Sequence, residues 1–324
     1  MIRRVSHVEI DSRLVEPSLW PVVIEIAAPE SGPTVAVTAN LHGDECNGIR
    51  AVQGLDKLLS GALTRGRVVL FPSLNPAGLA ARTRVLPVDG ADLNRAFPGD
   101  EVGTPAERYA DSIWMAILAQ APDLVIDLHS DAMAAHPYVL VDRVLSVRST
   151  PNLAETIERD AHSTGLTVVR DYPLEAYQRY GLERSLSGSL VNRAGIPALT
   201  LEVGPLRRID EAAVDCMVKA VVHVLSDRKM MGKVVSLGTV VPGNWCRSAG
   251  FRAPCDGLLR ARLPPGARFA AGEVLGWIES ITGEGLATVV APCDGLVLAW
   301  QEFAAVSAGN ILGTFAVVDK EGSR

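Results

Sequence analysis

The feature that most constrains the fold is the alternation, over the first two-thirds of the chain, of apolar runs with segments of helical periodicity. Residues 123–130 and 196–204 are short runs rich in apolar residues, typical of strands buried on both faces. Thr104, Pro105 and Glu107 form a capping-box pattern that predicts the start of a helix. Strands that alternate with helices predict an α/β fold, with a mixed, largely parallel sheet flanked by helices.

Three more strands and three more helices are expected in this region. Residues 21–28 and 34–40 are predicted to be neighbouring strands, because the Pro-Glu-Ser-Gly-Pro sequence between them favours a turn. Residues 67–75 are predicted to form another buried strand. Helices are expected over residues 46–59, near 151–164 and over about 210–225.

After Lys229 the sequence changes character, with more glycine and proline and no helical periodicity. Residues 252–261 recur almost unchanged as 290–299, and residues 271–278 recur as 308–315. Such repeated short strands joined by tight turns predict a small all-β domain with an internal repeat.

We therefore place an α/β domain at 1–232 and a β-barrel-sandwich-like accessory domain at 233–324. The accessory domain is similar to biotinyl and lipoyl carrier domains, but residues 234–319 contain no lysine, which excludes a swinging arm.

Composition excludes several classes of partner. The net charge is −6 and the sequence has no basic cluster, which argues against nucleic-acid binding. No apolar run is long enough to span a membrane, and the N-terminal residues lack the apolar core of a secretory signal. Five scattered cysteines without a Cys-x-x-Cys pair argue against a disulfide framework and a thiolate zinc finger. We expect a cytoplasmic protein.

Polar residues follow two of the predicted strands. His42 and Glu45 are three residues apart after the strand at 34–40, a spacing that brings both side chains to one face. His129 ends the run at 123–130, and ligands gather at the carboxyl ends of strands in open α/β sheets. Two histidines and a carboxylate suit zinc, and Asp127 is placed to orient His129. The alternative, that these are ordinary loop residues, stays open at this point.

Further polar residues could act beside such a site. Glu202 ends an apolar strand, where a carboxylate is costly unless it is used, so it is a candidate general base. Asn94 and Arg95 offer donors suited to a carboxylate, and Arg84 could stabilise a developing oxyanion. The alternatives are a structural glutamate paired with an arginine, and arginines that are only surface charges.

Four motifs in order, HGDE at 42–45, DGADLNRAFPG at 89–99, DLHS at 127–130 and LEVGP at 201–205, resemble the aspartoacylase/succinylglutamate desuccinylase family. That family belongs to the wider zinc carboxypeptidase group, and the similarity covers essentially the whole chain. The resemblance implies zinc-dependent hydrolysis of the amide bond of an N-acyl amino acid or a related small amide that bears a carboxylate. A carboxypeptidase acting on short peptides and a catalytically retired binding protein on the same scaffold are the alternatives.

The resemblance also implies roles for single residues. One Zn²⁺ per chain would be bound by His42, Glu45 and His129, with Glu202 as the catalytic carboxylate. Arg84 would polarise the scissile carbonyl, and Asn94 and Arg95 would bind a carboxylate of the substrate.

Relatives use a further arginine shortly before the catalytic glutamate and a tyrosine in the C-terminal domain. Residues 233–324 contain no tyrosine, and Arg193 or Arg184 is the candidate for the arginine. We expect residues 170–190 at the rim of the pocket, together with His136. The C-terminal domain is expected to shield the cleft or to support a subunit contact, which leaves a homo-oligomer open.

Overall fold

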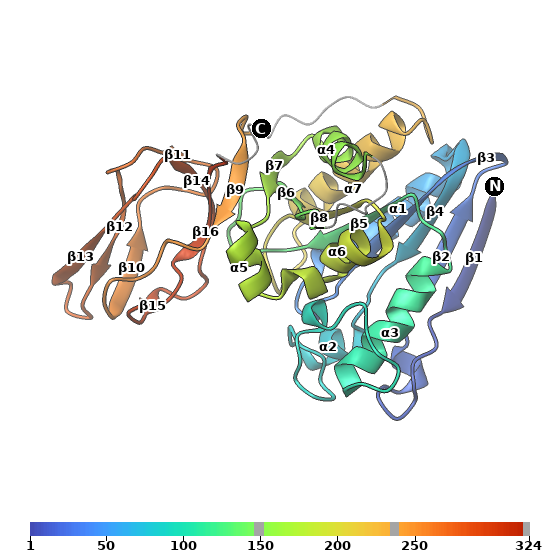
Figure 1. Ribbon diagram of the computed structural model, residues 1–324, viewed down its shortest axis with the longest axis horizontal. Coiled ribbons are helices and arrows are strands. Elements are labelled where there is room, and N and C mark those ends of the chain that lie inside the picture. Colours follow the sequence, from blue (N-terminus) through green and yellow to red (C-terminus); the bar gives the residue numbers. More distant parts are fainter. Residues whose placement is uncertain (146–151, 234–239, 320–324) are drawn as a thin grey trace.

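The computed structural model describes residues 1–145, 152–233 and 240–319 (Figure 1). Its N-terminal part contains strands β1 (Ile2–His7), β2 (Val22–Ala27), β3 (Glu30–Ala39), β4 (Arg65–Phe71), β5 (Leu124–His129), β6 (Tyr138–Val141), β7 (Thr167–Arg170) and β8 (Ala198–Glu202). The C-terminal part contains β9 (Trp245–Ser248), β10 (Gly257–Ala261), β11 (Arg268–Phe269), β12 (Val274–Glu279), β13 (Gly285–Val290), β14 (Gly295–Trp300), β15 (Ala305–Val306) and β16 (Gly313–Val318).

The helices all belong to the N-terminal part of the described chain. They are α1 (Asn47–Ala62), α2 (Pro76–Ala81), α3 (Pro105–Leu118), α4 (Leu153–Ser163), α5 (Leu174–Arg179), α6 (Leu186–Ser189) and α7 (Glu211–Asp227), with short turns of 3₁₀ or π helix at Pro17–Leu19, Leu93–Arg95, Leu182–Arg184 and Leu190–Ala194. The predicted capping box begins α3: the Thr104 hydroxyl accepts the Glu107 N–H, and the Glu107 carboxylate accepts the Thr104 N–H.

One sheet runs through the molecule in the order β1-β2-β4-β3-β5-β8-β6-β7-β9-β16-β14-β11. β4, β3, β5 and β8 are parallel neighbours, whereas β2 and β6 pair antiparallel to β4 and β8. Helices cover both faces: Gly48 of α1 approaches Ala39 and Leu128 on one face, and Ser187 of α6 bonds to Thr200 on the other. The predicted α/β fold with a mixed, largely parallel sheet is confirmed.

The predicted pairing of residues 21–28 with 34–40 is wrong. β4 lies between β2 and β3, because the chain crosses over through α1 before β4 enters the sheet. β3 also begins at Glu30, so most of the expected turn at 29–33 is part of the strand. Pairing of Glu30 with Arg65 of β4, with an irregularity before Thr34, outweighs the local turn preference.

The C-terminal part is built from the repeated units. β10 pairs with β12, and their repeat equivalents β14 and β16 pair in the same antiparallel way. The first pair belongs to a second sheet, β13-β12-β10-β15, which Figure 1 shows at the end of the molecule away from the N-terminus. Between the two sheets lies an apolar core in which the rings of Phe251 and Phe315 stack with their centroids 4.2 Å apart.

Backbone pairing joins the two parts of the chain. β7 pairs parallel to β9, with Val169 opposite Trp245 and Arg170 opposite Cys246. Arg207 also bonds to Glu302 at 2.8 Å. A boundary at 232/233 stays a prediction, since the sheet itself continues across it. Within the described residues, no helix has the length and apolar character needed to cross a membrane.

Candidate metal centre and active-site pocket

Three side chains from two strand ends meet at the carboxyl edge of the sheet. His42 and Glu45 lie in the turn between β3 and α1, and His129 is the last residue of the neighbouring strand β5. Asn40 holds the turn: it adopts a left-handed backbone conformation (φ 53°), and its amide donates to the carbonyls of His42 (2.9 Å) and Glu45 (3.1 Å). Asparagine tolerates this conformation better than most residues. The turn is therefore fixed by its own sequence.

The three side chains form a group that could hold a metal ion. Nδ1 of His42 lies 2.7 Å from one Glu45 oxygen, and Nδ1 of His129 lies 2.9 Å from the other. One ligand atom from each residue lies within 4.8 Å of the others, and each residue is at most 3% exposed. Two imidazole nitrogens and a carboxylate are the donors of many zinc sites, and other divalent metals accept them too.

The outer nitrogens of both imidazoles face carboxylates. Nε2 of His129 lies 2.7 Å from Asp127, whose other oxygen accepts the Thr38 hydroxyl. Nε2 of His42 lies 3.2 Å from Asp92. Carboxylates in these positions fix the orientation of a metal-binding imidazole and increase its basicity. Both Nδ1 atoms are thereby directed at the point where an ion would be held.

Electrostatics in this group favour positive charge between the three side chains. Burial would raise the pKa of the Glu45 carboxyl, but the imidazoles of His42 and His129 hold that pKa well below its usual range. Burial also opposes protonation of His129, yet Asp127 and Glu45 raise the pKa of its imidazole well above the usual value. A divalent cation can replace such a proton, because metal binding and protonation compete for the same nitrogen.

Gly43 is required by close packing of the backbone. A Cβ atom at this position would collide with the backbone of Gly78 and Leu79 in α2. The glycine thus lets the turn that carries His42 and Glu45 lie directly against α2.

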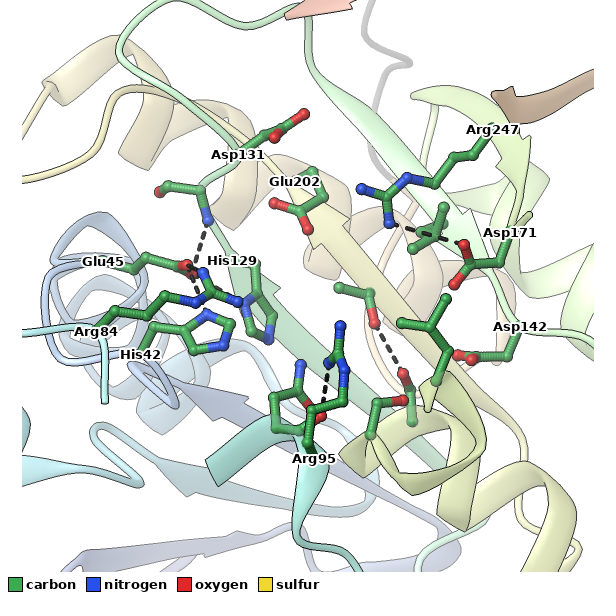
Figure 2. Close-up of a pocket in the computed structure, with 17 residues that line it drawn as sticks. His42, Glu45, Arg84, Arg95, His129, Asp131, Asp142, Asp171, Glu202 and Arg247 are labelled. Carbon is green, nitrogen blue, oxygen red and sulfur yellow. Dashed lines mark hydrogen bonds and ion pairs between the residues drawn. The ribbon is translucent and has the colours of Figure 1, made fainter. Parts of the chain in front are cut away.

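Beside this group lies a pocket of about 170 Å³ (Figure 2). Glu202, the last residue of β8, stands opposite His129 in the register of β5 and β8. Its Oε2 atom is shielded from solvent and has no hydrogen-bond partner among the described residues. Burial, together with Asp131 and Glu45, raises the pKa of Glu202 to about 7, although His129 opposes the rise.

The pocket also contains Arg84, Asn94 and Arg95. Arg84 pairs with Asp92 at 3.2 Å and lies 3.5 Å from Glu45. Nε and Nη1 of Arg95 donate to backbone carbonyls, at 2.8 and 2.7 Å, which holds its guanidinium in place. Figure 2 shows that guanidinium directed into the pocket.

Other expected residues lie elsewhere. Arg184 pairs with Glu107 at 2.8 Å, Arg193 is exposed, and neither lines the pocket. His136 bonds to Thr167 and packs against Gly266 of the C-terminal part, so it does not reach the pocket rim. Residues 170–190 do contribute, through Asp171, Leu182, Ser185 and Ser187.

Three charged residues of the pocket were not expected from the sequence, Asp131, Asp142 and Arg247, and Asp171 was expected only as part of the 170–190 segment. Asp142 and Asp171 directly follow β6 and β7, so the reasoning that identified His129 and Glu202 could have found them had these short strands been predicted. Arg247 lies on β9, and only the pairing of β9 with β7 brings it here.

Comparisons with known proteins agree with this architecture. The family described as succinylglutamate desuccinylase/aspartoacylase catalytic domain matches residues 31–228. N-alpha-acetyl-L-2,4-diaminobutyric acid deacetylase of Halomonas elongata is 39% identical over 116 residues, which are 35% of this chain and 34% of that protein. The match therefore spans about a third of that relative's length.

Solved structures show the same fold. A succinylglutamate desuccinylase/aspartoacylase from Rhodobacter sphaeroides superposes with a TM-score of 0.80 and 22% identity, covering 98% of this chain and 96% of that one. A product-bound ectoine utilization protein from Ruegeria pomeroyi gives 0.78 and 22%, covering 97% and 95%. A metallo-carboxypeptidase from Burkholderia cenocepacia gives 0.55 and 17%, covering 70% and 64%. The chain belongs to the succinylglutamate desuccinylase/aspartoacylase family.

Proposed function

We propose that this protein is a zinc-dependent hydrolase that removes the acyl group from a small N-acylated amino acid. The observation that carries the proposal is that His42, Glu45 and His129 stand beside Glu202 in one small pocket. The named activity of the Halomonas elongata relative, a deacetylase of an acylated amino acid, supports the same reaction class. A cavity of about 170 Å³ suits a small molecule rather than a long peptide.

The residues present fit a zinc ion. His42, Glu45 and His129 would hold it, with Asp92 and Asp127 fixing the two imidazoles. When bound, zinc would supply a Lewis acid that polarises the amide carbonyl and makes water a better nucleophile at neutral pH.

Glu202 is the residue that moves the proton. Its Oε2 is free of hydrogen bonds within the described chain, and the pKa of its carboxyl is raised to about 7. A group with such a pKa can accept a proton from water and return it near neutral pH. Glu202 therefore accepts a proton as water adds to the carbonyl carbon, and delivers it to the nitrogen as the C–N bond breaks. The products are a carboxylic acid, as its anion, and the free amine of the amino acid.

Arginines bind and stabilise the substrate. Arg95, already held by two backbone carbonyls, binds the α-carboxylate with help from Asn94. Arg84, 3.5 Å from Glu45, lies on the metal side of the pocket and stabilises negative charge that develops on the carbonyl oxygen. The α-carboxylate of the substrate and the carbonyl oxygen of its amide are thus bound by different arginines.

The test uses purified full-length protein. Metal analysis should find about one zinc per chain, and a panel of Nα-acetyl amino acids should be hydrolysed faster than dipeptides of the same amino acids. Glu202→Gln should keep the zinc and lose hydrolysis. Faster cleavage of dipeptides would indicate a carboxypeptidase instead, and a metal-free protein with no hydrolysis of any substrate would indicate a retired scaffold.

A further inference from the structure

A chain of three charged residues connects the C-terminal part to the metal-binding turn, residues 40–46 between β3 and α1. Asp44 lies in this turn between His42 and Glu45 and is 8% exposed. Its carboxylate pairs with Arg207 at 3.4 Å, and Arg207 pairs in turn with Glu302 at 2.8 Å. Glu302 lies between β14 and β15. The proposed reaction uses none of these three charges, and none of them lines the pocket.

Arg207 contacts Asp44 with both its backbone and its side chain. The N–H of Arg207 donates to the Asp44 carbonyl at 2.9 Å, and Nε donates to Oδ2 of Asp44 at 3.4 Å. Oδ1 of Asp44 is shielded from solvent and accepts no hydrogen bond from any described residue. Among the described residues, only Arg207 forms an ion pair with this carboxylate. Because a buried carboxylate is costly when it is unpaired, the contact fixes both partners.

Glu302 fixes the far end of the Arg207 side chain. This side chain is 55% exposed, so its guanidinium would sample several orientations if only Asp44 held it. Nη1 of Arg207 donates to Oε2 of Glu302 at 2.8 Å, and the Glu302 side chain is only 17% exposed. A guanidinium is planar and can donate to two carboxylates from one fixed orientation. Glu302 therefore directs Nε of Arg207 at Asp44.

The loop that carries Arg207 is held to α1 by separate bonds. The side-chain amide of Asn47 donates to the Pro205 carbonyl at 2.7 Å, and its oxygen accepts the Asp210 N–H at 2.8 Å. These bonds hold the loop backbone without any contribution from Glu302. What the C-terminal part adds is the orientation of one guanidinium.

We propose that Arg207 is a positioning residue through which the C-terminal part holds the metal-binding turn in its binding geometry. Glu302 orients the guanidinium, and the guanidinium fixes Asp44. Asp44 in turn keeps its neighbours His42 and Glu45 directed at one point. This inference rests on the proposed zinc site. The C-terminal part thereby supports zinc retention without touching the ion or the substrate.

A positioning role and a purely electrostatic role predict opposite effects at residue 207. Arg207→Gln removes a positive charge near the cation site. If Arg207 acted only through its charge, zinc would bind more tightly to the variant, because a repulsion between cations is lost. A positioning role predicts zinc binding about tenfold weaker, the effect of leaving a buried carboxylate without its partner. Competition with a chelator measures this affinity in the full-length protein, and tighter or unchanged binding would overturn the inference.

The link is also tested from its C-terminal end. Glu302→Gln should bind zinc about two- to fivefold more weakly than wild type, the contribution of a partly exposed ion pair. In an Asp44→Asn background the same change should have no further effect, because both residues act through Arg207. Wild-type affinity in Glu302→Gln, or additive effects of the two changes, would contradict the link. Glu302→Gln decides the matter if Arg207→Gln does not fold.

A matched control is Glu279→Gln. It makes the same change at a residue of β12 whose side chain is 29% exposed and pairs with Arg260 at 2.7 Å. β12 belongs to the second sheet, which lies at the end of the molecule away from the N-terminus (Figure 1). The control should bind zinc as wild type does, and a loss equal to that of Glu302→Gln would show that the effect is not specific to the link.

A measurement without zinc separates this inference from the proposed function. In zinc-free protein, hydrogen–deuterium exchange over residues 40–46 should be faster in Glu302→Gln than in wild type or Glu279→Gln. One N–H in this segment is that of Glu45, which donates to the His42 carbonyl at 3.1 Å. If wild type binds no zinc and hydrolyses no substrate, the proposed function fails, while faster exchange still supports the link. Equal exchange in all three proteins would reject the link even in an active zinc enzyme.

Discussion

Replacing Asp142 with asparagine should stabilise the protein, by an amount that increases with pH. The ordinary pKa of the carboxyl is 3.8, and burial beside Asp171 raises it to about 7. Because this pKa is higher in the folded state than in the unfolded state, the contribution of the protonated carboxyl to the free energy of unfolding is fully present below pH 3.8. It is lost as the pH rises through 7. The gap is about three units, and each unit corresponds to about 1.36 kcal/mol, so the loss is at most ~4 kcal/mol.

The assay is urea unfolding of zinc-saturated wild type and Asp142→Asn at pH 5 and pH 8, followed by tryptophan fluorescence. The difference in the free energy of unfolding should grow by up to ~3 kcal/mol between these values, in favour of the variant. Effects of pH on zinc binding occur in both proteins and cancel in the difference. A variant that is less stable than wild type at pH 8, or a difference that does not change with pH, would show that burial does not raise the pKa of the Asp142 carboxyl as described.

Three further changes test the metal centre and its surroundings. Glu202→Gln should retain zinc by metal analysis and lose at least ~100-fold in kcat, since a positioned acid or base contributes about 10²–10⁴-fold; a variant without zinc would point to a structural role instead. Asp127→Asn should weaken zinc binding by ~10–100-fold in competition with a chelator, and unchanged affinity would contradict its orienting role. Gly43→Ala should lower zinc content and the thermal midpoint together, because its Cβ meets the backbone of Gly78; normal values for both would refute the packing argument.

The strand ends that carry the metal group could be predicted because each follows a long apolar run. β3, β5 and β8 are central strands whose sequences have a clear strand pattern, so His42, His129 and Glu202 were identifiable as polar residues at one edge of a sheet. The capping box of α3 could also be predicted, because Thr104 and Glu107 form hydrogen bonds with each other's backbone N–H groups. Local sequence suffices where local contacts decide the structure.

The places of Asp142 and Arg247 in the pocket could not be predicted, for the opposite reason. β6 has only four residues, too few to show a period, so Asp142 looked like a loop residue; Asp171 after the equally short β7 was expected only as part of the 170–190 segment. Arg247 is 76 positions beyond Asp171 and reaches it only through strand pairing. The insertion of β4 between β2 and β3 is likewise a long-range choice that turn preferences at 29–33 do not contain.

The ladder between β7 and β9 has a consequence for how such proteins can diverge or be recombined. Residues after 240 are joined to the N-terminal part by main-chain hydrogen bonds, and one of their side chains, Arg247, lines the pocket. Exchanging this tail for that of a relative would therefore not attach a neutral appendage. It would replace one side of the pocket, and a slip of one residue in the pairing of β9 with β7 would turn Arg247 to the opposite face of the sheet.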